Sequence, residues 1–188
     1  LGLDSVEILF IHDPDANADE AILEAYPELD RMRSEGIIKA IGVGMNQCET
    51  PTRVIKETDI DMVLIAGRYS LLDQKAMEAL LPAALERNVD IIAAGVFNSG
   101  ILANPVKGAT YDYAPASDEL LAKAVRIREV LEGHQVSLTS AALQFPLRHP
   151  AVKSVLVGCR SAAEVATNIT EFDKTIENKV WDDLVSVL

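Results

Sequence analysis

The chain has 188 residues, of which 49% are hydrophobic and 5% aromatic, so it is long enough for one domain with a largely aliphatic core. Its net charge of −12 disfavours broad contact with nucleic acid or anionic membranes, because both need clustered Lys and Arg. No apolar run is long enough to span a membrane and no signal peptide precedes the first strand, which predicts a cytoplasmic protein.

Cysteine and histidine usage indicates neither a metal site nor a redox couple. Cys48 and Cys159 are far apart, without a C-x-x-C motif or a nearby pair of histidines, and we expect both to be reduced and buried. His134 and His149 are expected at helix ends, where an imidazole interacts favourably with the helix dipole.

Strand-like apolar runs alternate with helix-like runs along the chain. The runs are rich in Ile, Val, Leu and Ala without polar alternation, which is typical of strands buried on both faces of a parallel sheet. Each run ends in a polar or glycine cluster, and in parallel α/β folds these carboxyl ends carry the active site. We expect strands at residues 6–12, 37–45, 62–67, 89–96 and 152–158.

Helix signals follow the strands. The first helix is expected to begin at a capping box of Asn17 and Glu20, to kink at Pro27 and to stop at Gly36. Further helices are expected at 51–58, at 74–87, after Ser117, after Ser137 with a bend at Pro146, and around Trp181 and Leu184. Two sets of apolar residues recur at the spacing of one buried helix face: Leu120, Ala124, Ile127 and Leu131, and then Val165, Ile169, Phe172 and Ile176.

The longest irregular segment, 98–116, has the length of a lid or binding loop. Two architectures accept these elements, a doubly wound sheet and a (β/α)8 barrel. The Gly42-Val43-Gly44 stretch lacks the third glycine of a dinucleotide-binding G-x-G-x-x-G motif and follows the second strand instead of the first. A barrel accounts better for polar clusters at the ends of several strands, because its site draws on many strands at once.

Four stretches together resemble the aldo-keto reductase family: 2–15, with its strand leading to His12, 36–43, 141–147 and 157–168. The last is similar to the family's P-G-x-R cofactor segment, with Val157 in place of the proline. Three further stretches, 42–47, 66–74 and 95–102, are most similar to the branch of D-threo-aldose (L-fucose) 1-dehydrogenases and pyridoxal 4-dehydrogenases.

The resemblance implies a partial (β/α)8 TIM barrel, with residues 1–188 as a single domain that comprises strands four to eight and their helices. The family uses an Asp, Tyr, Lys and His tetrad, and His12 matches the histidine, which can help to polarise a substrate carbonyl. The other three residues are expected in a part of the barrel before residue 1. We therefore expect the chain alone to be inactive and prone to aggregation.

The resemblance also implies contacts to a nicotinamide cofactor. Asn46 matches the amide that holds the nicotinamide carboxamide, and Asn168 matches the residue that reads adenine. The backbone at Phe97, Asn98 and Ser99 is expected near the pyrophosphate. Gly158 and Arg160 precede a helix, where a guanidinium and free backbone N–H groups favour a phosphate.

Glu164 matches a position that often contacts the adenosine 2′-phosphate. A carboxylate there would repel the phosphate of NADP and suit the ribose diol of NAD, so we expect a preference for NAD with NADP still possible. Ser161 and Glu164 also have the spacing of a capping box, in which the carboxylate would turn back to the backbone.

The resemblance implies oxidation of an aldose, such as L-fucose or a D-threo-aldose, at C1 to the lactone, and pyridoxal oxidation is the alternative. A non-catalytic binding or regulatory protein of the same fold is a rival from another class, and upstream Asp, Tyr and Lys residues would distinguish the two. A metal-dependent barrel enzyme is disfavoured, because the sequence has no ligand cluster beyond His12, Asp13 and Asp15.

Overall fold

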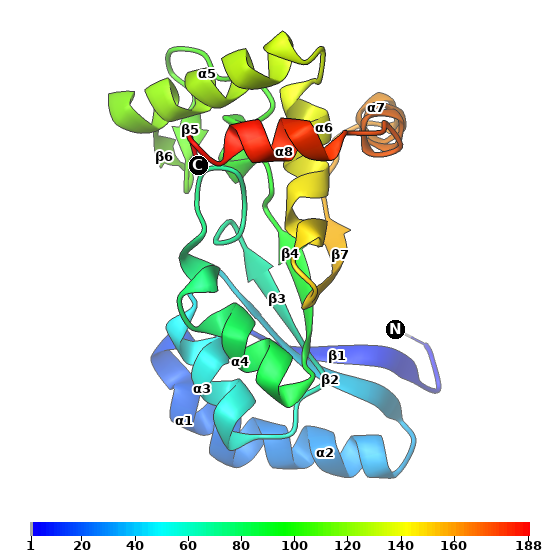
Figure 1. The fold of residues 1–188 in the computed structure, drawn as a ribbon. Helices are drawn as coiled ribbons and strands as arrows, with labels where there is room; N and C mark the ends of the chain where they lie inside the picture. The colour runs from blue at the N-terminus through cyan, green and yellow to red at the C-terminus, as the bar shows by residue number, and fades with distance from the viewer. Residues whose placement is uncertain (1) are drawn as a thin grey trace.

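The computed structural model describes residues 2–188, in which five strands form one parallel sheet. The strands lie side by side in chain order, β1-β2-β3-β4-β7 (Figure 1). A doubly wound sheet reverses its strand order partway, whereas a barrel adds each strand beside the previous one. The observed order is therefore that of a barrel segment. The strands are β1 (Val6–His12), β2 (Ile38–Met45), β3 (Met62–Ala66), β4 (Asp90–Ala94) and β7 (Val152–Leu156).

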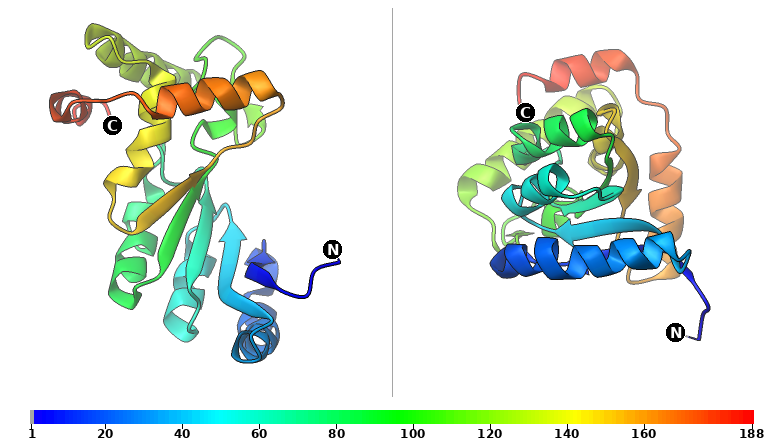
Figure 2. Two further views of the ribbon diagram at one scale, coloured as in Figure 1. Left: turned by 90° about the vertical axis from the view of Figure 1, so that its right-hand side faces the viewer. Right: turned by 90° about the horizontal axis from the view of Figure 1, so that it is seen from below.

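All five strands end at the same edge of the sheet, because every pairing is parallel. The register aligns the strand ends: His12 pairs with Gly44, Met45 with Ile65, and Ala94 with both Ala66 and Leu156. Figure 2 shows β2, β3, β4 and β7 directed towards the end of the molecule that carries α5, α7 and α8. We call this edge the carboxyl rim.

The three central strands form the core, and the two outer strands do not share its burial. Ile41, Val63 and Ile91 are completely buried, whereas Ile8 of β1 is 39% exposed and Leu156 of β7 is 53% exposed. The expectation that all strands are covered on both faces is thus wrong for β1 and β7, because each pairs with one neighbour among the described residues.

The first helical segment departs from the prediction. It runs through a 3₁₀ turn (Asp15–Asn17), α1 (Ala18–Glu20), a π turn (Ala21–Ala25) and α2 (Tyr26–Ser34). Asn17 makes no side-chain cap, so the predicted capping box is not formed. The wide π turn ends two residues before Pro27, whose ring and missing N–H do not fit a regular helical hydrogen bond to the preceding turn.

The other helices agree closely with the sequence pattern. Ser117 caps α5 and Ser137 caps α6, each accepting a hydrogen bond from a backbone amide three residues later. The predicted helix over 74–87 is a 3₁₀ turn (Lys75–Met77) followed by α4. The remaining bounds are α3 (Glu49–Glu57), α4 (Leu80–Arg87), α5 (Asp118–Gly133), α6 (Leu138–Gln144) followed by a 3₁₀ turn (Phe145–Arg148), α7 (Ala162–Phe172) and α8 (Asn178–Leu184).

The apolar face predicted for α7 is not buried. Val165, Ile169 and Phe172 are 43%, 57% and 41% exposed. The helix is attached through another side, where Glu171 accepts hydrogen bonds from Ser137 and Ser140 of the neighbouring α6 segment. The apolar stripe instead lines an open groove beside β7.

The long loop after β4 contains structure of its own. A 3₁₀ turn (Asn98–Gly100) begins it, and β5 (Thr110–Tyr111) and β6 (Ala114–Pro115) form a small antiparallel hairpin. This hairpin lies at the carboxyl-rim end of the molecule (Figure 1). None of the helices in residues 2–188 is both long and apolar enough to cross a membrane.

Candidate functional site

Every residue predicted to act in catalysis or cofactor binding lies at or just after a strand end on the carboxyl rim, or in the helix that follows it. His12 ends β1, Asn46 follows β2, the 97–99 turn follows β4, and the 158–168 segment follows β7. Because the strands are parallel and in register, these segments come from one edge of the sheet. Chemistry at that edge is the rule for parallel α/β folds.

His12 is open to a ligand. Its side chain is 84% exposed, and its Nδ1 lies 3.6 Å from the Asp13 carboxylate. The residue borders a cavity of about 440 Å³ that Asn17, Glu20 and Glu24 also line. An exposed imidazole held at a strand end can donate a hydrogen bond to a substrate oxygen.

Asn46 is held through its backbone, and its side chain has no hydrogen-bond partner among the described residues. Its carbonyl oxygen accepts a 2.8 Å hydrogen bond from Nε of Arg68, which follows β3. The amide group of Asn46 therefore remains available, on a backbone that a neighbouring strand end holds in place.

In the turn after β4, the backbone amides of two residues are free, and the side chain of the residue between them is buried. The Phe97 and Ser99 N–H groups donate to no group within residues 2–188, and Asn98 between them has a left-handed φ of 45°. Right-handed followed by left-handed backbone forms a concave nest of amides that binds anions. The Asn98 side chain itself is buried, donating to Gly67 O at 3.0 Å and accepting from Ser70 Oγ at 2.6 Å.

The start of α7 is built around a capping box. Ser161 Oγ accepts a 3.2 Å hydrogen bond from the Glu164 amide, and Glu164 accepts a 2.7 Å hydrogen bond from the Arg160 amide. The hydrogen bond from the Arg160 amide and the nearby Arg160 guanidinium hold the pKa of Glu164 below its usual value, so the carboxylate is charged at neutral pH. The amides of Ala162 and Ala163 have no partner in residues 2–188, which leaves N–H groups for an anion at this helix N-terminus.

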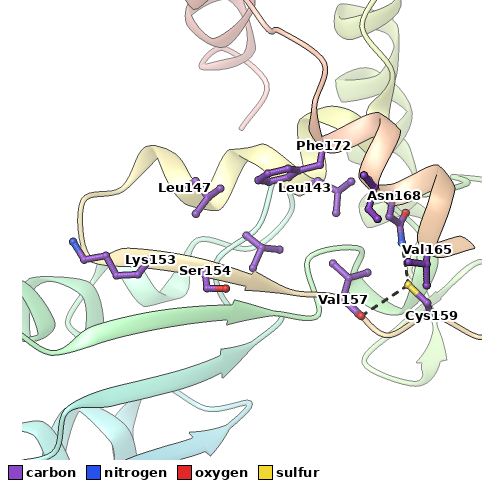
Figure 3. Close-up of a pocket in the computed structure, with 11 residues that line it drawn as sticks. Leu143, Leu147, Lys153, Ser154, Val157, Cys159, Val165, Asn168 and Phe172 are labelled. Carbon is purple, nitrogen blue, oxygen red and sulfur yellow. Dashed lines mark hydrogen bonds between the residues drawn. The ribbon is translucent and has the colours of Figure 1, made fainter. Parts of the chain in front are cut away.

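Asn168 lies in α7, and its side-chain Nδ2 donates a hydrogen bond to Cys159 Sγ at 3.3 Å. Figure 3 shows both side chains at one end of the apolar groove between β7 and α7, a cavity of about 340 Å³. Cys159 is exposed, so the expectation of two buried cysteines is wrong for it, because it follows the strand end and lies outside the core. Cys48 is buried, and burial raises the pKa of its thiol to about 11.

The structure adds residues that the sequence did not single out. Arg68, Asp73, Tyr111 and Asp112 form one polar cluster at the carboxyl rim. The only sequence signal for this cluster is that Arg68 follows a strand end. Its partners lie 5 to 44 residues away along the chain. Among residues 2–188, no group of three or more His, Cys, Asp or Glu side chains is arranged to hold a metal ion.

Similar solved structures confirm the fold. An aldo-keto reductase from Bacillus halodurans in its holo form superposes with a TM-score of 0.80 at 22% identity, covering 98% of this chain and 61% of that chain. A glycerol dehydrogenase from Gluconobacter oxydans gives a TM-score of 0.70 at 16% identity, over 99% of this chain and 59% of the other. The chain thus has the fold of a partial barrel.

Two relatives found by sequence share a higher identity with this chain than these structures do. D-threo-aldose 1-dehydrogenase from a Pseudomonas species is 41% identical over 187 residues, which cover 98% of this chain and 57% of that protein. Pyridoxal 4-dehydrogenase from Microbacterium luteolum is 38% identical over 197 residues, covering 99% of this chain and 58% of that protein. The chain thus spans less than three-fifths of the length of either relative. Residues 1–188 all match the model of the Aldo/keto reductase family, and the chain belongs to that family.

Proposed function

We propose that the chain is the C-terminal five-eighths of an NAD(P)-dependent oxidoreductase that oxidises an aldose, such as L-fucose or a D-threo-aldose, at C1 to the lactone. The observation that carries this proposal is the 41% identity to D-threo-aldose 1-dehydrogenase across almost the whole chain. The open edges of the sheet at Ile8 and Leu156 also support a barrel that further strands complete.

Different residues of the carboxyl rim would bind different parts of the cofactor. The free backbone amides of Phe97 and Ser99 would bind one end of the dinucleotide's pyrophosphate. The free amides at the start of α7 would bind the other end. Asn46 would hold the nicotinamide amide and Asn168 the adenine. When bound, the nicotinamide supplies a hydride acceptor for the C1 hydrogen of the sugar.

His12 would orient the sugar. Its imidazole, 84% exposed at the end of β1, would hydrogen-bond the C1 oxygen while a tyrosine outside residues 1–188 removes the hydroxyl proton. Loss of that proton and transfer of hydride convert the hemiacetal C1–OH into the lactone carbonyl. The negative charge developing on oxygen is what a positioned donor stabilises most.

Pyridoxal is the second candidate substrate, favoured by the 38% identity to pyridoxal 4-dehydrogenase. Its cyclic hemiacetal presents the same reacting group as the sugar. The two candidates differ in the ring that the substrate wall must accommodate.

We propose NAD as the preferred cofactor. Arg160 directly precedes the helix proposed to bind the adenosine, and its guanidinium lies 3.3 Å from the Glu164 carboxylate. The pair brings a negative charge to the site and leaves the guanidinium partly neutralised, and both effects disfavour the extra phosphate of NADP.

The test is steady-state kinetics of the full-length enzyme with L-fucose and with pyridoxal, each with NAD and NADP. We expect sugar oxidation with NAD, and in His12→Gln a loss of about 10²–10³-fold in kcat with nucleotide affinity unchanged. Faster turnover of pyridoxal than of L-fucose would instead identify pyridoxal as the substrate. Nucleotide binding without oxidation of either substrate would instead support a non-catalytic binding protein.

A further inference from the structure

One guanidinium connects three loops of the carboxyl rim. The Arg68 side chain is only 16% exposed. Its Nε donates to the Asn46 carbonyl at 2.8 Å, and its Nη2 donates to Asp112 at 2.6 Å. Nη1 lies 3.3 Å from each of Asp73, Tyr111 and Asp112. The loops after β2 and β3 are thereby joined to the hairpin of residues 110–115.

The 110–115 hairpin is held from two sides. Tyr111 donates its hydroxyl proton to Asp73 at 2.8 Å, and burial together with this hydrogen bond raises the pKa of Tyr111. On the other side, Ser99 accepts hydrogen bonds from the Tyr113 amide and from the Thr110 hydroxyl. The hairpin thus contacts the β4 turn proposed for the pyrophosphate as well as Arg68.

The turn of the hairpin, at Asp112 and Tyr113, has the features of a segment that can open. Asp112 and Tyr113 both have left-handed backbone, and the Tyr113 side chain is 95% exposed. Left-handed φ is unfavourable for a bulky residue, so the turn depends on its external contacts. The Asp112 carboxylate is 46% exposed, and ion pairs in contact with water are weak enough to break readily.

Arginine is suited to this place because its planar head can bond in two directions at once. The edge with Nε faces Asn46, and the end with Nη2 faces Asp112. A lysine could pair with Asp112, but its single ammonium could not also fix the Asn46 carbonyl in the same geometry. Loss of the Asp112 contact would leave the guanidinium with the longer contact to Asp73 as its ion pair, and would therefore loosen the group that holds Asn46.

We propose that Arg68 is a positioning residue that couples closure of the 110–115 hairpin to the orientation of Asn46. A nicotinamide nucleotide held at Asn46 and the closed hairpin then favour each other. This inference rests on the proposed function, since it takes Asn46 as the nicotinamide contact. Coupling of this kind is reciprocal, so the nucleotide closes the hairpin as strongly as closure tightens nucleotide binding.

The chain contains a convenient reporter. Lys107 is exposed and is the only Lys or Arg between Arg87 and Lys123, so trypsin can cut the loop at one place. In the full-length enzyme we expect saturating NAD to slow cleavage at Lys107 by about tenfold. In Asp112→Asn this protection is lost, and the Kd for NAD rises by the same factor.

Matched variants separate coupling from simple damage. Without nucleotide, trypsin is expected to cleave Arg68→Lys at the wild-type rate, because the lysine retains the charge that pairs with Asp112. NAD is expected not to slow the cleavage of this variant. Two control variants make the same changes at exposed positions whose side chains have no partners among residues 2–188. Glu78→Gln removes one negative charge, as Asp112→Asn does, and Arg126→Lys makes the same exchange as Arg68→Lys. Both controls are expected to behave as wild type. Thermal unfolding midpoints confirm that each variant is folded before cleavage is compared.

The failures are distinguishable. A wild-type enzyme that binds neither NAD nor NADP would reject the proposed function and the coupling together. NAD binding with equal protection in wild type, Asp112→Asn and Arg68→Lys would reject only the coupling. A fall in kcat at saturating NAD with unchanged Kd would also overturn it, because a positioning role at Asn46 must act on nucleotide affinity.

Discussion

The Ser70 hydroxyl donates a 2.6 Å hydrogen bond to the side-chain oxygen of Asn98, and both residues are almost completely buried. The Asn98 amide in turn donates to the Gly67 carbonyl. The loops after β3 and β4 are therefore fastened together beneath the proposed pyrophosphate site. This role belongs to the Asn98 side chain, whereas the proposed cofactor contact belongs to the backbone around it.

We expect Asn98→Ala to lower the free energy of unfolding by about 2–4 kcal/mol, because it leaves two buried polar groups unpaired and places alanine at a left-handed φ. Urea unfolding of the full-length protein measures the change. Asn104→Ala, an exposed asparagine in the same loop, is the control and should alter stability by less than about 0.5 kcal/mol. Equal stability of the two variants would show that the buried bonds contribute nothing net.

Gly42→Ala should destabilise the sheet by about 1–3 kcal/mol. A Cβ at Gly42 would lie 2.4 Å from two ring atoms of Phe10, its partner on β1. Gly44→Ala is the matched control, since its nearest neighbour would be at an ordinary 3.7 Å. A second substitution, Phe10→Leu, should recover part of the loss in a double-mutant cycle, and additive effects would contradict the steric explanation.

Cys159 should report nucleotide binding directly. It is exposed beside Arg160 and Asn168, whereas Cys48 is buried with its pKa raised to about 11. We expect N-ethylmaleimide to label Cys159 and not Cys48, because the reactive thiolate is scarce at Cys48. Saturating NAD should slow this labelling by about tenfold. Labelling of Cys159 at the same rate with and without nucleotide would remove this segment from the cofactor site.

Glu164→Gln should shift the ratio of kcat/KM for NAD over NADP towards NADP by about tenfold, because it removes the charge that repels the 2′-phosphate. The same change weakens the capping box. Ser161→Ala therefore serves as the control, since it removes the hydrogen bond to the Glu164 amide without changing the charge. A similar shift in both variants would assign the effect to the helix end instead of the carboxylate.

Acid should destabilise the fold partly through His149. Burial lowers the pKa of His149 below 6.5, and its Nδ1 accepts a hydrogen bond from the Ala151 amide. The unfolded chain therefore binds this proton more readily than the folded chain, and stability falls as the pH drops through 6.5 towards the lowered pKa. Urea unfolding at several pH values should show a smaller acid loss in His149→Gln than in wild type. Parallel pH profiles for the two proteins would rule out this contribution.

Local signals in the sequence were enough for the strands, for most of the helices and for the rim, although the predicted capping box at Asn17 is not formed. Ser117, Ser137 and Ser161 cap helices as their spacing predicts, because a cap depends on residues three positions apart. The apolar runs place His12 and Asn46 at strand ends, and parallel pairing then brings those ends to one edge.

Two features depended on contacts that no local pattern records. The apolar stripe of α7 has the spacing of a buried face, yet Ile169 is 57% exposed, because burial requires a neighbouring surface as well as a pattern. Arg68 meets Asn46 and Asp112, 22 and 44 residues away.

Residue order along the chain therefore specifies which groups stand at strand and helix ends, because hydrogen-bonded turns and apolar periodicity act over a few positions. Which of those groups meet is a property of the assembled sheet and its loops. The guanidinium of Arg68 finds its partners only when three strand ends lie side by side, since side-chain hydrogen bonds form within about 3 Å and chain separation gives no measure of that distance.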